Sequence, residues 1–148
     1  MKKNTILRRL RGKIEKAILA NAAFLSYLGE KDSLEYQTLV KMKRWTREKQ
    51  WVQNQTMDEI ARDLNISRGQ LSLYFCKHVG VSFIRWRRDI RIKEAKRLML
   101  SDKDIPLTAI GEAVGISDRS SFRRQFKEVT GLNPSVWRSK HQAKILGK

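Results

Sequence analysis

The chain has 148 residues, with 32 Lys and Arg against 15 Asp and Glu and a formal net charge of +17. This charge favours a surface that binds phosphate, although ribosomes, anionic membranes and acidic proteins also attract basic surfaces. With Cys76 as the only cysteine, two histidines and no glycine-rich phosphate loop, the sequence predicts no intrachain disulfide, no metal site, no cofactor and no enzymatic activity.

The N-terminal segment, residues 1–36, is predicted to form a basic amphipathic helix from about residue 5 to residue 28. Apolar residues recur there at alternating spacings of three and four, as in the a/d seam of a coiled coil, and Asn21 falls on that seam. The seam predicts a homodimer through residues 5–28. The alternative is that this helix packs on the rest of the domain, or is the end of a larger one.

A first helix-turn-helix is predicted over residues 56–80. Ala61 is small where the second helix must cross the first, and Asn65 accepts the left-handed conformation that ends a helix. Ser67 is placed to cap the second helix, with Gln70 at capping-box spacing. The apolar residues keep helical spacing on both sides of this turn: Met57, Ile60, Leu64, Leu71, Phe75 and Val79.

A connecting helix is predicted next, over residues 82–100, with Ser82 as its cap. At 1.5 Å per residue it would be about 27 Å long, somewhat less than the roughly 34 Å between successive major-groove faces of DNA. Its predicted inward stripe consists of Phe83, Trp86, Ile90, Ala95, Leu98 and Met99.

A second helix-turn-helix over residues 106–131 repeats the first at an offset of 50 residues, which becomes 51 after the turn. Gly111 takes the place of the small residue, Gly115 that of the turn residue, and Asp118 that of the cap. A closing helix over 133–141 begins with a cap followed by proline at the first helical position. A basic tail, residues 143–148, ends the chain.

The second helix of each unit carries the candidate DNA-binding residues, because that helix enters the major groove. Arginine pairs with guanine, serine with any base edge, glutamine with adenine, and leucine lies against a thymine methyl group. The base-reading candidates are Arg68, Gly69, Gln70, Ser72 and Leu73 in the first unit and Arg119, Ser120, Ser121, Arg123 and Arg124 in the second. The candidates for DNA-backbone contacts are Ser67, Lys77, Asp118 and Lys127. The alternative is that these are ordinary solvated helix faces, and it carries most weight for Gly69 and Leu73.

The segment from about residue 39 to residue 140 resembles the DNA-binding domain of AraC-type transcription regulators. The likeness rests on the strings IARDLNISRGQLSLYF, RIKEAKRLML and GISDRSSFRRQFKEVTGLNPSVWR. It implies two helix-turn-helix subdomains joined by a long helix, with both recognition helices on the same side of DNA. The first recognition helix is uncharged at Ser72 and Leu73, positions where the family often carries polar or basic readers, which places more of the expected discrimination on the second unit. The family commonly adds a sensing domain, so the chain is expected to be either a stand-alone form or a fragment of a longer regulator.

The sequence thus predicts an all-α fold: two helix-turn-helix subdomains joined by a long central helix, preceded by the basic amphipathic helix. The expected domains are 1–36, 37–142 and the tail. The expected function is a sequence-specific regulator of transcription that binds double-stranded DNA, an activator by family analogy, with RNA polymerase as a further partner. The alternative is a non-specific architectural nucleic-acid-binding protein. No membrane partner is expected, because the uncharged run from Ala17 to Gly29 is too short to span a bilayer, and the predicted location is cytoplasmic and nucleoid-associated.

Overall fold

A computed structural model describes residues 33–145 and residue 147. The predicted helix over residues 5–28 and its dimer seam lie outside the described residues. Within them the chain forms helices and no strand, so the predicted all-α fold is confirmed. The elements are α2 (Leu34–Arg47), the 3-10 helix η2 (Gln50–Val52), α3 (Met57–Asp63), α4 (Arg68–Tyr74), the π-helix η3 (Phe75–Val79), α5 (Phe83–Ser101), α6 (Leu107–Ala113), α7 (Arg119–Thr130) and α8 (Pro134–Ile145).

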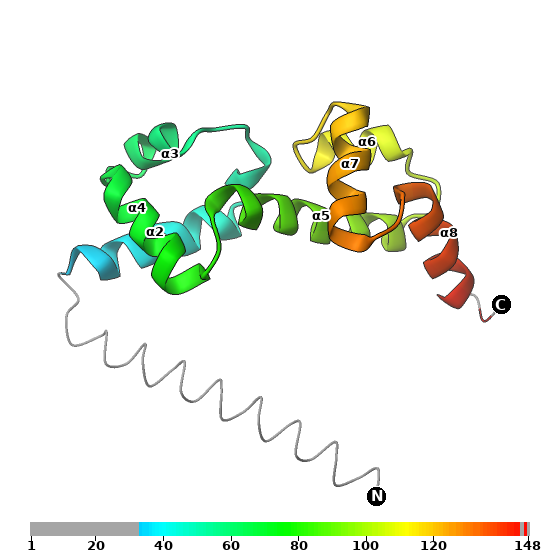
Figure 1. Ribbon diagram of the computed structural model, residues 1–148, viewed down its shortest axis with the longest axis horizontal. Coiled ribbons are helices and arrows are strands. Elements are labelled where there is room, and N and C mark those ends of the chain that lie inside the picture. Colours follow the sequence, from blue (N-terminus) through cyan, green and yellow to red (C-terminus); the bar gives the residue numbers. More distant parts are fainter. Residues whose placement is uncertain (1–32, 146, 148) are drawn as a thin grey trace, which may run out of the picture.

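Two hydrophobic cores lie at the two ends of α5, which runs as a rod between the lobes in Figure 1. The first core joins α2, η2, α3, α4, η3 and the start of α5, and its buried residues are Met42, Trp45, Trp51, Ile60, Ala61, Leu71, Phe75 and Phe83. The second joins the rest of α5 to α6, α7 and α8, and its buried residues are Ile92, Ala95, Met99, Ile110, Val114, Ile116, Phe122, Phe126 and Trp137. Each predicted helix-turn-helix therefore has a core of its own, and α5 belongs to both.

The two turns have the same geometry, as the sequence repeat predicts. Asn65 and Gly115 both have positive φ, at 51° and 84°. In each copy the residue that follows donates its backbone N–H back to the small residue of the first helix: Ile66 to the Ala61 carbonyl at 3.0 Å and Ile116 to the Gly111 carbonyl at 2.8 Å.

The caps of the recognition helices also match the prediction. The Ser67 hydroxyl accepts the Gln70 backbone N–H at 3.0 Å, and the Asp118 carboxylate accepts the Ser121 backbone N–H at 2.7 Å. The Gln70 side chain completes the capping box by accepting the Ser67 backbone N–H at 2.7 Å. Because these bonds satisfy amide groups that a helix leaves free at its start, both recognition helices begin where the sequence predicts.

The repeat extends further than the helix-turn-helix units, because α5 and α8 play equivalent parts. Arg87 of α5 donates to the Gln55 carbonyl at 2.6 Å, and Arg138, its counterpart at an offset of 51, donates to the Lys103 carbonyl at 3.5 Å. One turn later, Gln142 donates to the Met99 carbonyl at 3.3 Å. In each unit the closing helix thus holds the backbone that leads into the helix-turn-helix.

Several predicted boundaries differ from the structure. The closing helix was expected to end at residue 141 but continues through residue 145 and takes in part of the predicted basic tail. The connecting helix ends at residue 101 instead of 100. The expected boundary between residues 36 and 37 falls inside α2, whose Ser33 cap starts the helix earlier. The end of the first recognition unit, residues 75–79, is a π-helix in which the Gly80 N–H reaches the Phe75 carbonyl five residues back.

The predicted inward stripe of α5 is incomplete. Its half-buried members Trp86, Ile90 and Leu98 pack against the two cores as expected, but the stripe omits Arg91 and Ile92, which are buried. At 3.6 residues per turn, Ile92 lies about 180° around the helix from Phe83. The helix therefore turns different faces to its two cores, and a single stripe cannot describe it.

Candidate nucleic-acid interface

The predicted base-reading residues form two exposed surfaces on the recognition helices. The first reading surface consists of Arg68, Gly69, Gln70, Ser72 and Leu73 on α4. The second reading surface consists of Arg119, Ser120, Ser121, Arg123 and Arg124 on α7. All are exposed except Gln70 and Ser121, which are half-buried beside the caps that they complete. The aromatic residues between the second set, Phe122 and Phe126, are buried in the core as predicted.

The first reading surface has its polar groups partly engaged. The Gln70 side-chain oxygen accepts the Ser67 N–H in the capping box. A bidentate pair with adenine needs that oxygen as well as the amide nitrogen, so the predicted pair forms only if the capping bond is released. Arg68 is held at 2.9 Å from Asp58 in an exposed ion pair, which costs little to exchange for a base or phosphate. Leu73 is 44% exposed, an apolar group in position for a thymine methyl group.

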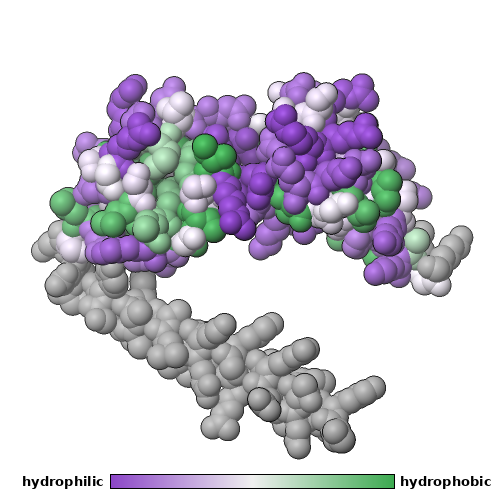
Figure 2. Space-filling view, viewed as in Figure 1, coloured by the Kyte–Doolittle hydropathy of each residue, from purple (hydrophilic) through white to green (hydrophobic). Residues whose placement is uncertain are grey.

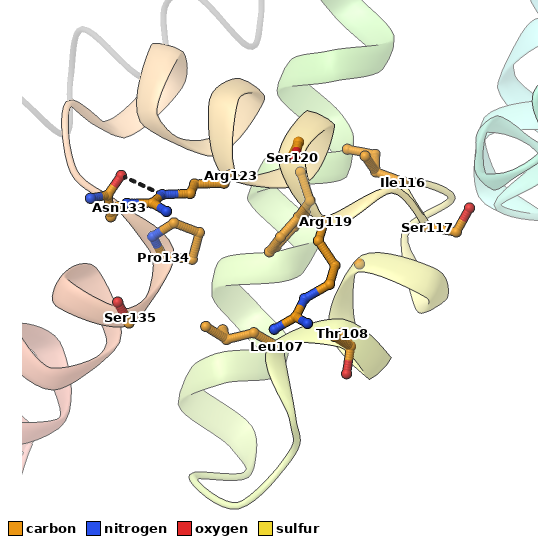
Figure 3. Close-up of a pocket in the computed structure, with 12 residues that line it drawn as sticks. Leu107, Thr108, Ile116, Ser117, Arg119, Ser120, Arg123, Asn133, Pro134 and Ser135 are labelled. Carbon is orange, nitrogen blue, oxygen red and sulfur yellow. Dashed lines mark hydrogen bonds between the residues drawn. The ribbon is translucent and has the colours of Figure 1, made fainter.

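The second reading surface borders a groove of about 410 Å³ between the N-terminal ends of α6, α7 and α8. In Figure 3, Arg123 extends toward Asn133 at the start of α8, and Arg119 extends the opposite way, toward Leu107 and Thr108 on α6. The Arg123 guanidinium donates to the Asn133 side-chain oxygen at 3.4 Å, a long bond that leaves its other N–H groups available. The two arginines therefore spread the positive charge of α7 across the whole groove.

Hydroxyl groups complete the groove, and sequence reasoning selected only part of this set. Besides the predicted Ser120, the lining includes Thr108, Ser117 and Ser135. The sequence could have indicated these three residues, because each lies in or just before the first turn of a predicted helix. Hydroxyls and backbone N–H groups at that place favour the binding of an anion. The arrangement can accept phosphate oxygens beside the base-reading arginines.

The four predicted backbone-contact residues are placed differently from one another. Lys127 is exposed on α7. Lys77 lies on η3, 3.7 Å from Glu35 of α2. Ser67 and Asp118 are the helix caps. Hydrogen bonds from Ser121 hold the pKa of Asp118 below its ordinary value, so the carboxylate stays charged. A negative side chain repels phosphate, and we therefore assign Asp118 to capping.

The two recognition helices lie on the same side of the frame. In Figure 1, α4 crosses in front of α2, and α7 crosses in front of α5. On that side, Figure 2 shows mostly hydrophilic residues over the lobe of α6 and α7 and an apolar stretch on the lobe of α2, α3 and α4. The second unit thus presents the more polar surface.

Comparison with known proteins identifies the domain. A family model described as a helix-turn-helix domain matches residues 60–140, more than half of the chain. The arabinose operon regulatory protein of Escherichia coli (strain K12) is 37% identical over 86 residues, which are 58% of this chain and 29% of that protein. The protein of the same name from Salmonella typhimurium is 39% identical over 80 residues, 54% of this chain and 28% of that protein. The C-terminal domain of AraT, a response regulator from Geobacillus stearothermophilus, matches in structure with a TM-score of 0.57 and 31% identity, covering 64% of this chain and 83% of that one.

The chain belongs to the AraC-type helix-turn-helix family. It spans less than a third of the length of the two arabinose operon regulators. An AraC-type domain binds double-stranded DNA, which agrees with the partner predicted from the sequence. The relatives are named as regulators and not as enzymes, in agreement with the prediction that this chain has no catalytic activity.

The described part of the chain offers neither a membrane-spanning helix nor a cluster of metal ligands. No helix within the part of the chain that the structure describes is long and apolar enough to cross a membrane. In the same residues, no group of three or more His, Cys, Asp and Glu side chains is placed to hold a metal ion. Cys76 is exposed on η3, away from the groove.

Proposed function

We propose that the chain is a sequence-specific regulator of transcription that reads two adjacent major-groove faces of DNA with α4 and α7. The observation that carries this proposal is the pair of capped recognition helices, each with an exposed face of base-pairing residue types, on the same side of one continuous helix. Phosphate contacts from basic side chains and helix N-termini would position the protein, and base contacts would specify the site.

The second recognition helix is the main source of specificity in this proposal. It offers three exposed arginines, of which Arg123 and Arg124 are adjacent on the outer face, and a bidentate arginine–guanine pair contributes about 1–3 kcal/mol of discrimination. The first recognition helix offers Leu73 and a glutamine whose oxygen is already bonded. We therefore expect a long site in which the half read by α7 is better defined than the half read by α4.

The length of α5 bears on the shape of the bound DNA. Its 19 residues correspond to about 28 Å at 1.5 Å per residue, which is shorter than the roughly 34 Å between successive major-groove faces. A helix of this length holds the two recognition helices roughly one helical turn of DNA apart, and we propose that the DNA bends toward the protein when both engage.

The experiment that tests the proposed function is selection of binding sites from a randomised duplex library, followed by footprinting. The expected result is one motif with two parts about one helical turn apart. Enrichment without any motif would contradict the proposal. Placing the selected site upstream of a reporter promoter and then across it distinguishes activation, the role that we propose, from repression by occlusion.

A second function, non-specific architectural binding, is favoured by the net charge of +17. Binding of that kind rests on release of counterions from the DNA and loses about 10³–10⁵ in affinity between 50 and 200 mM salt when 6–10 phosphates are contacted. Titrations of the selected site and of a scrambled duplex over this range separate the two functions. A specific regulator keeps a preference for its site at the higher salt, whereas the two curves of an architectural protein coincide throughout.

A further inference from the structure

A buried arginine lies where the two subdomains meet. Arg91 of α5 is 5% exposed, and its guanidinium donates to the backbone carbonyls of Trp51, Val52 and Gln53 at 2.9, 3.1 and 3.0 Å. It also donates to the Asn54 side-chain oxygen at 3.1 Å. Burial, aided by the like charge of Arg87, lowers the pKa of Arg91 to about 10, so the side chain stays charged at neutral pH. One side chain thus binds the whole segment that leads from η2 of the first subdomain into α3.

The turn of the second helix-turn-helix rests on the same segment. A Cβ atom on Gly115 would lie 2.0 Å from the Val52 carbonyl oxygen and 3.0 Å from the Arg91 guanidinium. No side chain fits into that space, so the backbone of the second turn packs directly against the first subdomain. The equivalent turn residue of the first unit, Asn65, carries a side chain and is exposed. The glycine at position 115 is therefore required by this contact, whereas the positive φ of the turn alone also accommodates asparagine, as at position 65.

These contacts link the two subdomains directly, in addition to α5. The packing of each core on its own face of α5 sets the separation and rotation of the two units, and a direct contact between them holds this arrangement against bending and twisting of the helix. We propose that Val52, Arg91 and Gly115 form an inter-subdomain joint that fixes the spacing, in base pairs, at which α4 and α7 read DNA together. This inference rests on the DNA-binding function proposed above. In it, Arg91 and Gly115 are positioning residues that contact no base.

The glycines of the chain offer a matched pair of variants. Gly115→Ala introduces a methyl group into the joint, at a backbone φ of 84°. Gly131→Ala introduces the same methyl group at a φ of 79°, where no atom lies within 4 Å. Both variants suffer the same left-handed backbone strain, but only the first displaces the two subdomains. A difference in behaviour between Gly115→Ala and Gly131→Ala is therefore caused by the altered inter-subdomain joint and not by backbone strain.

The functional test measures binding to the selected site and to versions with one base pair inserted or deleted between its two parts. Each change moves one half-site by about 35° and 3.4 Å. For the wild type and Gly131→Ala we expect a loss of about tenfold per changed base pair, similar to one mismatch. For Gly115→Ala we expect the affinity to depend less on the number of base pairs between the two parts, or to be highest at a different number. A dependence on spacing that equals that of Gly131→Ala would overturn the joint.

A measurement without DNA keeps the joint separate from the proposed function. Cys76, the only cysteine, is exposed on η3 of the first subdomain, and Ser139→Cys adds an exposed site on α8. Spin labels at the two positions should give one narrow distance distribution, broadened or shifted in Gly115→Ala but not in Gly131→Ala. If the library yields no motif while this difference is seen, the proposed function fails and the rigid joint stands. An unchanged distribution in Gly115→Ala would overturn the joint whatever the DNA result.

A second variant guards against a Gly115→Ala protein that does not fold. Arg91→Lys keeps the positive charge but replaces a planar fork by one ammonium group, which cannot reach all four oxygen acceptors. We expect the label distribution to broaden and the spacing profile to flatten, with circular dichroism still reporting a helical protein. A folded Arg91→Lys protein with wild-type spacing preference would contradict the role given to Arg91.

Discussion

Arg123 and Arg124 are neighbours in sequence but have different surroundings. Arg123 is drawn toward α8 by the Asn133 side chain, whereas the charge of Arg124 acts on Asp118 at the start of its own helix. We predict that Arg123→Ala or Arg124→Ala weakens binding to the selected site by about 1–3 kcal/mol and relaxes the preference at one base pair. Competition assays with all four bases at each position measure this effect.

The control for this prediction is Lys144→Ala, which removes one exposed charge at the far end of α8. It should weaken binding to all sequences slightly and equally. If an arginine variant behaves like Lys144→Ala, that arginine contacts phosphate and does not read a base.

Glu94 gives a prediction about pH at the residue scale. It accepts hydrogen bonds from Arg97 and from Lys49, and these bonds lower its pKa from the ordinary 4.5 to about 2. Because the pKa is lower in the folded state, the stabilisation is complete above pH 4.5 and is lost as the pH falls toward 2. We predict that Glu94→Gln reduces the free energy of unfolding by about 1 kcal/mol at pH 7, a modest value because both partners are exposed.

Urea denaturation of wild type and Glu94→Gln at pH 7 and near pH 2.5 measures this difference. It should shrink at the lower pH, since the wild-type carboxylate is then partly protonated. Glu112→Gln, at an exposed position on α6, is the matched control and should change little. A difference between wild type and Glu94→Gln that is independent of pH would show that packing, and not charge, is the cause.

At the scale of single elements, the start of α7 separates capping from DNA contact. Asp118 caps the helix through its bond to Ser121, and asparagine can make the same bond without the charge. We predict that Asp118→Ala lowers the free energy of unfolding by about 1 kcal/mol, whereas Asp118→Asn stays close to wild type in stability and binds DNA as well or better. Weaker DNA binding by a stable Asp118→Asn protein would show that the carboxylate itself serves the interface.

The elements also show which features can be read from sequence. Asn65, Gly115 and the two caps were predictable because their signals are local: a residue type that suits one backbone conformation, or an acceptor three residues before an amide group. The reading surfaces were predictable for the same reason, because exposure on α4 and α7 follows from the phase of the buried residues between them. The contacts of Arg68 with Asp58 and of Arg123 with Asn133 were not foreseen, since Asp58 and Asn133 come from other elements.

Arg91 was not predictable by such reasoning. An arginine in a helix normally indicates exposure, and its burial depends on backbone carbonyls that lie 40 residues away in sequence. The same is true of α5 as a whole, whose two buried faces can be assigned only when the positions of both cores are known. The internal structure of each subdomain could therefore be predicted from the sequence, whereas the contacts between the subdomains could not.

At the scale of the whole molecule, the sharing of α5 predicts cooperative unfolding. Phe126 is fully buried in the second core and packs edge-on against Trp137. Phe126→Ala should cost about 3–5 kcal/mol, and because α5 loses its packing on one side, the first core should unfold with the second. Three of the four tryptophans lie in or against the first core, so fluorescence reports mainly that core, whereas circular dichroism reports all helices.

Thermal unfolding of Phe126→Ala followed by both signals tests this coupling. We expect one unfolding transition, at a lower temperature than in the wild type and at the same temperature in fluorescence and circular dichroism. A fluorescence transition that stayed at the wild-type temperature, with an earlier partial loss of helix signal, would mean that the first subdomain is stable alone.

The shared helix has a practical consequence for altering what the protein recognises. The contacts of the exposed residues on α4 and α7, such as Arg68 with Asp58 and Arg123 with Asn133, lie within their own lobe, so either set can be exchanged for another without disturbing the opposite lobe. A substitution inside α5 disturbs the core that the residue packs into and, because both cores pack on this one helix, can shift the other core as well. To change the DNA sequence that the protein recognises, one should therefore substitute exposed residues of α4 and α7 and leave α5 unchanged.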